Sequence, residues 1–262
     1  MSENRDGRKI KSVQRVRTFI DLLRDKNEAT LTEVTEEVDL TVGTVHTYLN
    51  TLQAMNIVVK EGDVFKLSPR LVVLGEHVRN QTPLYRAAQP QIDRLAATTG
   101  EAVHLIIEDN GRGISLYERL GADAIGTEYH RKLRQQSHNL LHCTASGKAI
   151  LEGLPDQRVH DIIDRHGLQR QTTNTITTRE DLFEDLKKIR ERGYAINDEE
   201  EVLGIFAVGV GIQDEGGNIL GSVSMSAPKA HMDRKDVRRD VVDELTRASN
   251  AIEANLHNLD RE

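Results

Sequence analysis

Residues 30–67 constrain the fold more than any other part of the chain, because they carry the pattern of two short helices followed by a pair of strands. Thr30 or Thr32 can cap the first helix, and Thr41 is a suitable N-cap for the second. The expected buried stripes are Leu31, Val34 and Val38 in the first helix, and Val45, Leu49, Leu52 and Met55 in the second. Segments 57–60 and 64–67 flank Glu61-Gly62-Asp63, which predicts a two-stranded wing. This plan is typical of a winged helix-turn-helix, which lays its second helix in the DNA major groove.

A further helix is predicted upstream, with Ser12 as its N-cap. Its expected apolar face consists of Val13, Val16, Phe19, Ile20 and Leu23. Three helices and a wing make a complete small domain. Because helix-turn-helix geometry also serves in protein–protein modules, a domain that touches no DNA is the alternative interpretation.

The distribution of charge favours DNA more than the net charge of −7 suggests. The first 80 residues hold equal numbers of basic and acidic side chains, so the excess negative charge lies after them. The basic residues Arg5, Arg8, Lys9, Lys11, Arg15 and Arg17 lie together near the N-terminus, interrupted by the single acid Asp6. Such an arm can neutralise phosphates, although a solvated terminal charge run has the same composition.

A chain of 262 residues is long enough for two ordinary domains. No apolar run reaches the length of a membrane span, and the first residues do not resemble a signal peptide, so we expect a cytoplasmic protein without a membrane partner. The single cysteine, Cys143, excludes an internal disulfide and fits a reducing compartment.

The second part of the chain is predicted to be an α+β domain with an antiparallel sheet and helices packed against it. Predicted helices cover 70–81, 84–98, 146–151, 155–166, 178–192 and 234–259, and predicted strands cover 102–108, 113–119, 194–197, 205–212 and 219–225, with a further strand possible at Ala124–Tyr129. We therefore expect a two-domain chain with boundaries at 1–69, 70–82 and 83–262. Segment 70–82 is the expected linker helix, and its Leu71–Val78 stripe favours self-association because a linker has little domain to cover it.

Several blocks along the chain resemble the IclR family of transcriptional regulators. They are SVQRVRTFIDLL at 12–23, GTVHTYLNTLQ at 43–53, FKLSPRLVVLG at 65–75, LHCTASGKAILEGLP at 141–155 and RERGYAINDEEEVLGIFAVGVGIQDEGGNILGSVSMSAP at 190–228. The resemblance implies an N-terminal winged helix-turn-helix, a linker helix and a GAF-like C-terminal domain that binds a small metabolite. It also implies a homodimer or homotetramer on a palindromic operator of double-stranded DNA.

The segment from Thr41 to Met55 contains no Lys or Arg, whereas the family's recognition helix often begins Pro-Lys-Ser-Thr. Base and nearby contacts are therefore expected from Thr41, Val42, Gly43, Thr44, His46, Thr47 and Asn50, through hydroxyl, amide and methyl groups. Phosphate contacts are expected from outside the helix, at Arg8, Lys9, Lys11, Arg15, Lys60 and Lys66.

The resemblance places the effector carboxylate at the start of the helix in the block Thr144–Ala149, where free backbone N–H groups attract an anion. The implied effector-binding residues are Ala145, Ser146, Asn197, Ala207, Ser224 and Ser226. In some relatives the positions of Asn197 and Ala207 hold an acid and a cysteine. A small polar effector, such as an organic or sugar acid, is the expected ligand.

Catalytic and metal sites are not expected. Ser146-Gly147-Lys148 lacks the first glycine of a phosphate-binding loop, and no Gly-x-Ser-x-Gly elbow exists. Metal-ligating candidates are His130, His138, His142 and Cys143, but neighbours on a strand point to opposite faces. We therefore expect no cofactor and a regulator rather than an enzyme. The alternative is an enzyme acting on a small metabolite and fused to a DNA-targeting domain, which would need a paired nucleophile and base.

Overall fold

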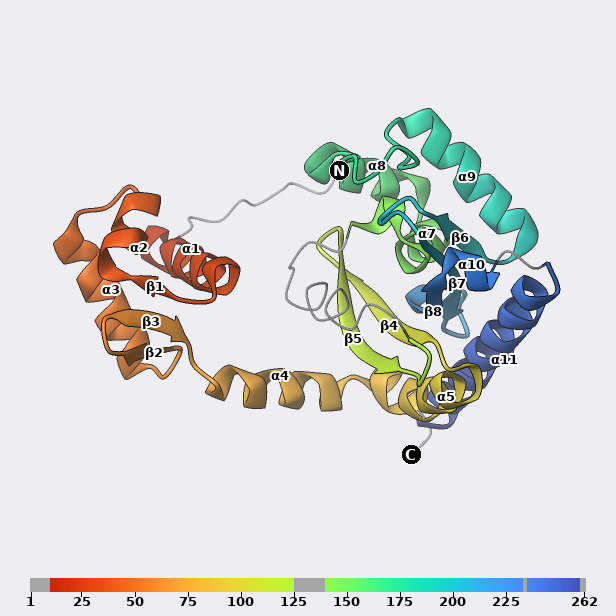
Figure 1. The fold of residues 1–262 in the computed structure, drawn as a ribbon, viewed down its shortest axis with the longest axis horizontal. Helices are drawn as coiled ribbons and strands as arrows, with labels where there is room; N and C mark the ends of the chain where they lie inside the picture. The colour runs from red at the N-terminus through yellow and green to blue at the C-terminus, as the bar shows by residue number, and fades with distance from the viewer. Residues whose placement is uncertain (1–9, 125–139, 233–234, 260–262) are drawn as a thin grey trace. The chain divides into compact units, whose positions relative to one another are not determined.

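The computed structural model describes residues 10–124, 140–232 and 235–259, and the chain divides into two compact units (Figure 1). The first unit is Met1–Val78 and the second is Arg79–Glu262. The division falls within helix α4 (Arg70–Gln81), which was expected as a linker helix and has the predicted bounds. The packing of the chain therefore changes within this helix.

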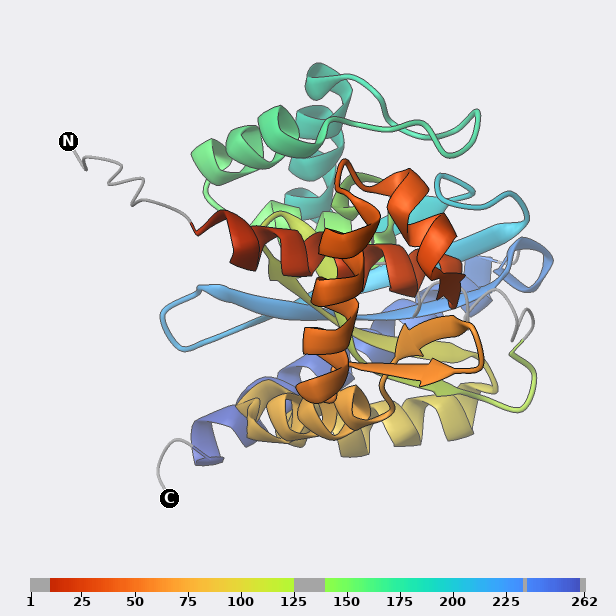
Figure 2. The same ribbon diagram turned by 90° about the vertical axis from the view of Figure 1, so that its left-hand side faces the viewer.

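The first unit consists of three helices and a small antiparallel sheet (Figure 2). Its elements are α1 (Lys11–Lys26), β1 (Ala29–Thr30), α2 (Leu31–Glu37), α3 (Val42–Ala54), β2 (Val58–Glu61) and β3 (Val64–Leu67). The strand order is β1-β3-β2, so the predicted wing is present and gains a short third strand that the sequence pattern did not predict. The core joins all three helices to the sheet through Phe19, Val34, Val45, Leu49 and Phe65.

Side-chain caps set the start of both helices in the helix-turn-helix. Thr30 and Glu33 form a reciprocal capping box at α2, and the Thr41 hydroxyl accepts the Thr44 N–H at the start of α3. Of the two predicted caps for α2, Thr30 is therefore the one used. Val45, Leu49 and Leu52 bury one face of α3, and the face that carries His46 and Asn50 is exposed.

Three local predictions in this unit are wrong. Ser12 does not cap α1, because the helix starts at Lys11, two residues earlier than that cap implies, and Ile10 occupies the N-cap position without a side-chain hydrogen bond. Val13 is 64% exposed, because the first turn of α1 extends beyond the core. Met55 is 61% exposed, because α3 ends at Ala54 and Met55 is its C-cap.

The second unit is built on a five-stranded antiparallel sheet in the order β5-β4-β8-β7-β6. The strands are β4 (Ala102–Asp109), β5 (Arg112–Leu120), β6 (Ala195–Asp198), β7 (Ile205–Gln213) and β8 (Ile219–Pro228), so the predicted strands in the described residues are confirmed. Asn110 and Gly111 both have positive φ, which is the conformation that a tight two-residue hairpin between β4 and β5 requires. The strand predicted at 124–129 lies outside the described residues apart from Ala124.

Helices α5 (Pro83–Thr99) and α11 (Lys235–Leu259) cover one face of this sheet (Figure 1). That face is apolar, and the buried side chains include Val103, Leu105, Val208, Val223 and Met225. Helix α11 contributes a buried stripe of Val241, Leu245, Ala248, Ile252 and Leu256. Gly100 ends α5 in the left-handed conformation, which glycine adopts without strain. This face therefore forms the main core of the second unit.

Helix α7 (Ala145–Gly153) packs on the opposite face of the sheet at unusually short range. A Cβ added to Gly209 would lie 2.6 Å from the Ala145 carbonyl oxygen, so a side chain at this position would push the helix away. The remaining helices in the described residues are α8 (Asp156–His166), α9 (Arg179–Arg192), the short α10 (Lys229–Met232) and a 3-10 turn, η1 (Leu141–Cys143). His142 and Cys143 lie in that turn, so the expectation that they occupy a strand is wrong. No helix in the described part of the chain is long and apolar enough to cross a membrane.

Candidate functional site

The outward face of α3 is formed by the residues that the sequence pattern assigned to base contacts. Thr41, Val42, Gly43, His46, Thr47 and Asn50 are exposed, and Thr44 is half-buried. The Asn50 Nδ2 lies 3.2 Å from the His46 Nδ1, so these two side chains hold each other on one surface. The surface presents amide, imidazole, hydroxyl and methyl groups, which are the chemical groups that distinguish base edges in a major groove.

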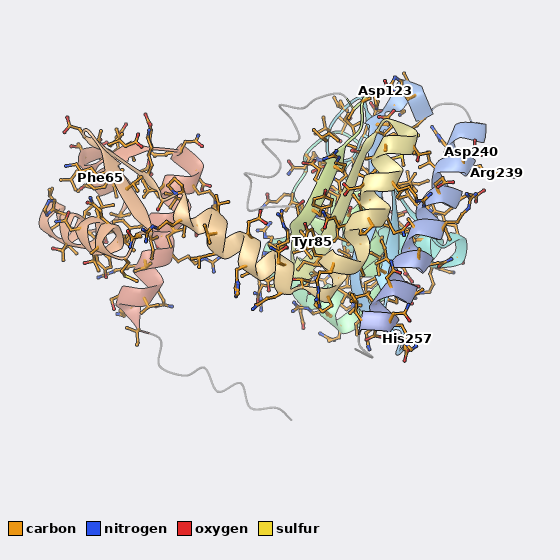
Figure 3. The ribbon with its side chains drawn as sticks, turned by 90° about the horizontal axis from the view of Figure 1, so that it is seen from below. Phe65, Tyr85, Asp123, Arg239, Asp240 and His257 are labelled. Atoms are coloured by element: carbon orange, nitrogen blue, oxygen red, sulfur yellow. The ribbon has the colours of Figure 1, made fainter. Side chains whose placement is uncertain are left out.

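The cations that the sequence assigned to phosphate contacts differ in how far neighbouring carboxylates already neutralise them. Lys66 Nζ lies 2.8 Å from Glu61 and 3.0 Å from Glu28, and these carboxylates raise the pKa of the ammonium. Lys60 instead lies over the ring of Phe65, which Figure 3 labels in β3, at 5.4 Å from its centroid. Within the described residues Lys11, Arg15 and Lys60 form no ion pair, whereas Arg8 and Lys9 lie outside those residues.

The residues assigned to the effector lie together on the polar face of the second unit's sheet. Asn197, Ala207 and Ser226 are direct neighbours across β6, β7 and β8, and Ser224 is two residues from Ser226 on the same side of β8. Ser146 in α7 reaches the sheet from above, with its Oγ 2.6 Å from the Ser224 Oγ. Residues separated by up to eighty positions in the sequence therefore form one polar patch.

The start of α7 supplies the groups that could hold an anion at this patch. Thr144 caps the helix through a hydrogen bond from the Gly147 N–H at 2.9 Å. The preceding N–H groups, those of Ala145 and Ser146, belong to the first helical turn and have no partner within the helix. Because the positive end of a helix favours negative charge, this position suits a carboxylate.

Two further residues complete the polar patch, and the sequence pattern did not single them out. His104 lies beside Ser224 and Glu118 across β8, β4 and β5. Its Nε2 is 3.0 Å from the Ser226 Oγ and its Nδ1 is 3.3 Å from the Glu118 Oε1. In the strand AVHLIIE, His104 points to the sheet face opposite to that of the buried Val103 and Leu105. This alternation could have identified His104 as a residue of the polar face.

A buried ion cluster of Lys148, Glu200 and Asp185 is linked to the patch through Asn197. Lys148 is 1% exposed, and its Nζ lies 2.6 Å from Glu200 and 2.8 Å from Asp185. Burial raises the pKa of the Glu200 carboxyl above its ordinary value, against the opposing attraction of the Lys148 ammonium. The Glu200 N–H donates to the Asn197 Oδ1 at 2.8 Å. The oxygen of the Asn197 side chain is thereby occupied, and its NH₂ group remains to donate.

Neither His142 nor Cys143 has the environment of a metal ligand or a nucleophile. Burial lowers the pKa of His142, and its Nε2 donates to the Gln169 carbonyl at 3.1 Å. Burial raises the pKa of the Cys143 thiol, which keeps it protonated. Among the described residues no three His, Cys, Asp or Glu side chains are arranged to hold a metal ion, and His130 and His138 lie outside that part of the chain.

Two family models together match most of the chain. The model described as "Bacterial transcriptional regulator IclR C-terminal" matches residues 76–254, and the "IclR helix-turn-helix domain" matches residues 12–62. The first match includes every residue of the polar patch, and the second includes all of α3.

Individual proteins of known name are similar over nearly the full length. The chain is 37% identical over 256 residues to the "Probable HTH-type transcriptional regulator ArcR" of Halobacterium salinarum, covering 97% of each protein. The crystal structure of the Thermotoga maritima IclR superposes with a TM-score of 0.71 at 26% identity, covering 94% of this chain and 98% of that one. An IclR homolog from Microbacterium hydrocarbonoxydans, solved in complex with 4-hydroxybenzoate, has a TM-score of 0.76 at 20% identity, covering 93% and 98%. The last likeness shows a shared fold.

Proposed function

The chain belongs to the IclR family of bacterial transcriptional regulators, and on that premise we propose that it binds a palindromic operator whose affinity changes when a small organic or sugar acid occupies the polar patch. The observation that carries the proposal is the meeting of Ser146 and Ser224 beside the start of α7, where hydroxyl groups and free backbone N–H groups converge on one place. That combination recognises a carboxylate bearing further polar groups.

Base recognition in the operator is assigned to α3. Contacts with the phosphate backbone of the DNA are assigned to residues outside that helix. Asn50 is the residue most suited to reading adenine, and the methyl groups of Val42 and Thr47 suit thymine. Lys11, Arg15 and Lys60 are the described cations free to meet phosphates, with Arg8 and Lys9 as further candidates. Lys66 is a weaker candidate because two glutamates already neutralise it.

Self-association is assigned in part to α4, between an operator-binding domain at 1–69 and an effector domain at 83–262. None of its residues is buried, and Val72, Val73, Leu74 and Val78 are each more than 60% exposed. An exposed apolar run of this kind is costly to leave in water and is typical of an interface. A second copy of the same helix would cover it and give the two-fold symmetry that a palindromic operator requires.

Effector binding is expected to act through the contacts that link the patch to its surroundings. A ligand oxygen that accepts a hydrogen bond from the Asn197 amide would shift this side chain and with it the hydrogen bond to the Glu200 N–H. The shift would reach Lys148 and α9 through the ion pair of Glu200. The relative from Microbacterium, which was solved in complex with 4-hydroxybenzoate, supports a small organic acid as the ligand of this fold. A ligand changes operator affinity only to the extent that it binds the two states differently.

Footprinting on the DNA upstream of the protein's own gene tests the first half of the proposal. Protection that spans two half-sites about one helical turn apart is expected, and its absence at low salt with and without candidate acids would refute operator binding. Thermal-shift screening of hydroxy acids, sugar acids and aromatic acids tests the second half, because a ligand of the folded state raises the melting temperature.

A second candidate function follows from the row Glu118, His104 and Ser226, which has the order of an orienting acid, a base and a nucleophile. His104 forms a hydrogen bond with Ser226, and its Nδ1 lies 3.3 Å from the Glu118 carboxylate. It would favour the enzyme alternative, an acyl hydrolase fused to a DNA-targeting domain. Against it, Ser226 lies in the regular strand β8 rather than at a sharp turn, and the relatives are named as regulators. Steady hydrolysis of an activated ester by the pure protein, abolished by Ser226→Ala, would support this second candidate over the first.

A further inference from the structure

A cavity lies in the effector domain, away from the polar patch. It has a volume of about 650 Å³, within the range of small-molecule sites, and none of its lining residues belongs to the patch. It is formed where the start of α5, the turn between β7 and β8, and the last turns of α11 meet. Figure 3 labels His257, which marks this end of α11.

The floor of the cavity is apolar and partly open to solvent. Leu84 and Leu256 are buried at its base, Ile107 is half-buried, and Leu220 is 37% exposed. Pro83, the first residue of α5, adds an exposed ring at the edge. An apolar group entering the cavity would remove these side chains from water, which is the main source of affinity for small ligands.

Carboxylates dominate the charged groups at the rim of the cavity. They are Glu108, Asp214, Glu215 and Glu253, and no Lys or Arg is found among the described residues that line the cavity. Hydrogen bonds from Asn218 and from the Gly216 N–H hold the pKa of Asp214 below its usual range. Glu253 accepts the Gln213 N–H at 2.8 Å, while Glu108 contacts Arg158 from outside the cavity at 2.7 Å. Glu215 pairs with His257 across the mouth.

We propose that this cavity binds a hydrophobic amine, with the apolar group against Leu220 and Leu256 and the ammonium among the rim carboxylates. An acid of the kind assigned to the polar patch would meet like charge here, so the two sites select opposite ligands. A neutral ligand of the same shape would gain the apolar contact but lose the attraction of the rim.

A ligand in the cavity is also expected to stabilise the first turn of α5. Thr82, the N-cap residue, lines the cavity, and its carbonyl accepts the N–H groups of Tyr85 and Arg86. A ligand that packs against Pro83 and Leu84 holds this turn in place. Amide hydrogen exchange at Tyr85 and Arg86 therefore slows when the cavity is filled.

The test compares three probes of one shape on the full-length protein: 2-phenylethylamine, 2-phenylethanol and phenylacetate. Methyl NMR is expected to show saturable shifts at Leu220 and Leu256 with the amine, binding at least tenfold weaker for the alcohol, and none for the acid. Tighter binding of the alcohol or the acid, or no amine-induced shift at millimolar concentration, overturns the proposal.

Two variants locate the binding. Leu220→Arg places a cation in the cavity and is expected to weaken amine binding at least tenfold, whereas Leu203→Arg, at another exposed leucine, leaves it unchanged. Glu253→Gln keeps an acceptor for the Gln213 N–H and is expected to weaken the amine at least threefold without affecting the alcohol. Unchanged amine affinity in Leu220→Arg, or a change of oligomeric mass in that variant, would assign the cavity to another role. These results do not depend on operator or effector binding.

Discussion

The Ser146 and Ser224 hydroxyls lie 2.6 Å apart, which joins the first turn of α7 to a central strand of the effector domain. Both side chains are buried, and because buried hydroxyl groups need a hydrogen-bond partner, each hydroxyl satisfies the other. A ligand that binds there must compete for or extend this contact. Substitutions at this pair can therefore distinguish its contribution to stability from its contribution to effector binding.

Ser224→Ala is expected to abolish the rise in melting temperature produced by the best acid from the screen, because the variant loses one hydroxyl of the patch. The variant leaves the buried Ser146 hydroxyl without its partner, so the unliganded melting temperature should fall modestly while the fold is retained. Ser249→Ala, a buried serine that bonds the Gly211 carbonyl on the other side of the sheet, is the matched control. An acid-induced shift that survives in Ser224→Ala would exclude this serine from the site.

Lys148→Met is expected to lower the free energy of unfolding by about 3 kcal/mol or more, because it leaves Glu200 and Asp185 without their shared buried cation. The measurement is urea unfolding at neutral pH. Lys188→Met removes the exposed ion pair with Glu184 in α9 and serves as the control, with no change expected. Equal effects of the two substitutions would show that the Lys148 cluster contributes no more than a surface pair.

Stability is expected to fall as the pH drops below 6.5, with His142 as one cause. Burial holds the pKa of the folded His142 below the ordinary value of 6.5, so the unfolded chain binds this proton first and stability is lost as the pH falls toward the folded value. His142→Gln retains a donor for the Gln169 carbonyl and should reduce the difference in unfolding free energy between pH 7.5 and pH 5.5. The exposed His77→Gln should leave that difference as in the wild type.

Lys60→Ala is expected to weaken binding to specific and random DNA alike and to reduce the slope of log affinity against log salt by about 0.9, the value for one phosphate contact. Lys66→Ala should have a smaller effect on both quantities, since Glu28 and Glu61 already neutralise its ammonium. Titrations at several salt concentrations by fluorescence anisotropy measure the slopes. A larger effect for Lys66 would mean that DNA displaces the two glutamates.

Charges placed at Leu71 and Leu74 are expected to give monomers without unfolding the chain, because α4 buries no residue in a single copy. Light scattering reports the mass and circular dichroism reports the helix content. Asn80→Glu adds a charge to an exposed polar position of the same helix and should leave the mass unchanged. A constant mass in the leucine variants would place the interface elsewhere.

The elements and their order followed from local signals in the sequence. Thr41, Gly100 and Gly193 mark helix ends by the capping rules, and the Asn110-Gly111 turn marks a hairpin by its need for positive φ. The failures at Ser12, Val13 and Met55 all lie at helix termini. Whether a terminal turn contacts the core depends on where neighbouring elements end, and periodicity within one helix carries no information about that.

The sequence by itself therefore determined most of the secondary structure, because caps, turns and apolar periods act between near neighbours. The motif blocks indicated the family and the residues proposed for the effector. Only the tertiary structure decided which polar residues meet. The strand order β5-β4-β8 brings His104 and Glu118 beside Ser226. The cavity proposed for an amine is lined by separate segments of α5, β4, the β7–β8 turn and α11. Strand order and register arise from burying one whole sheet face, a property of the complete chain that local patterns do not contain.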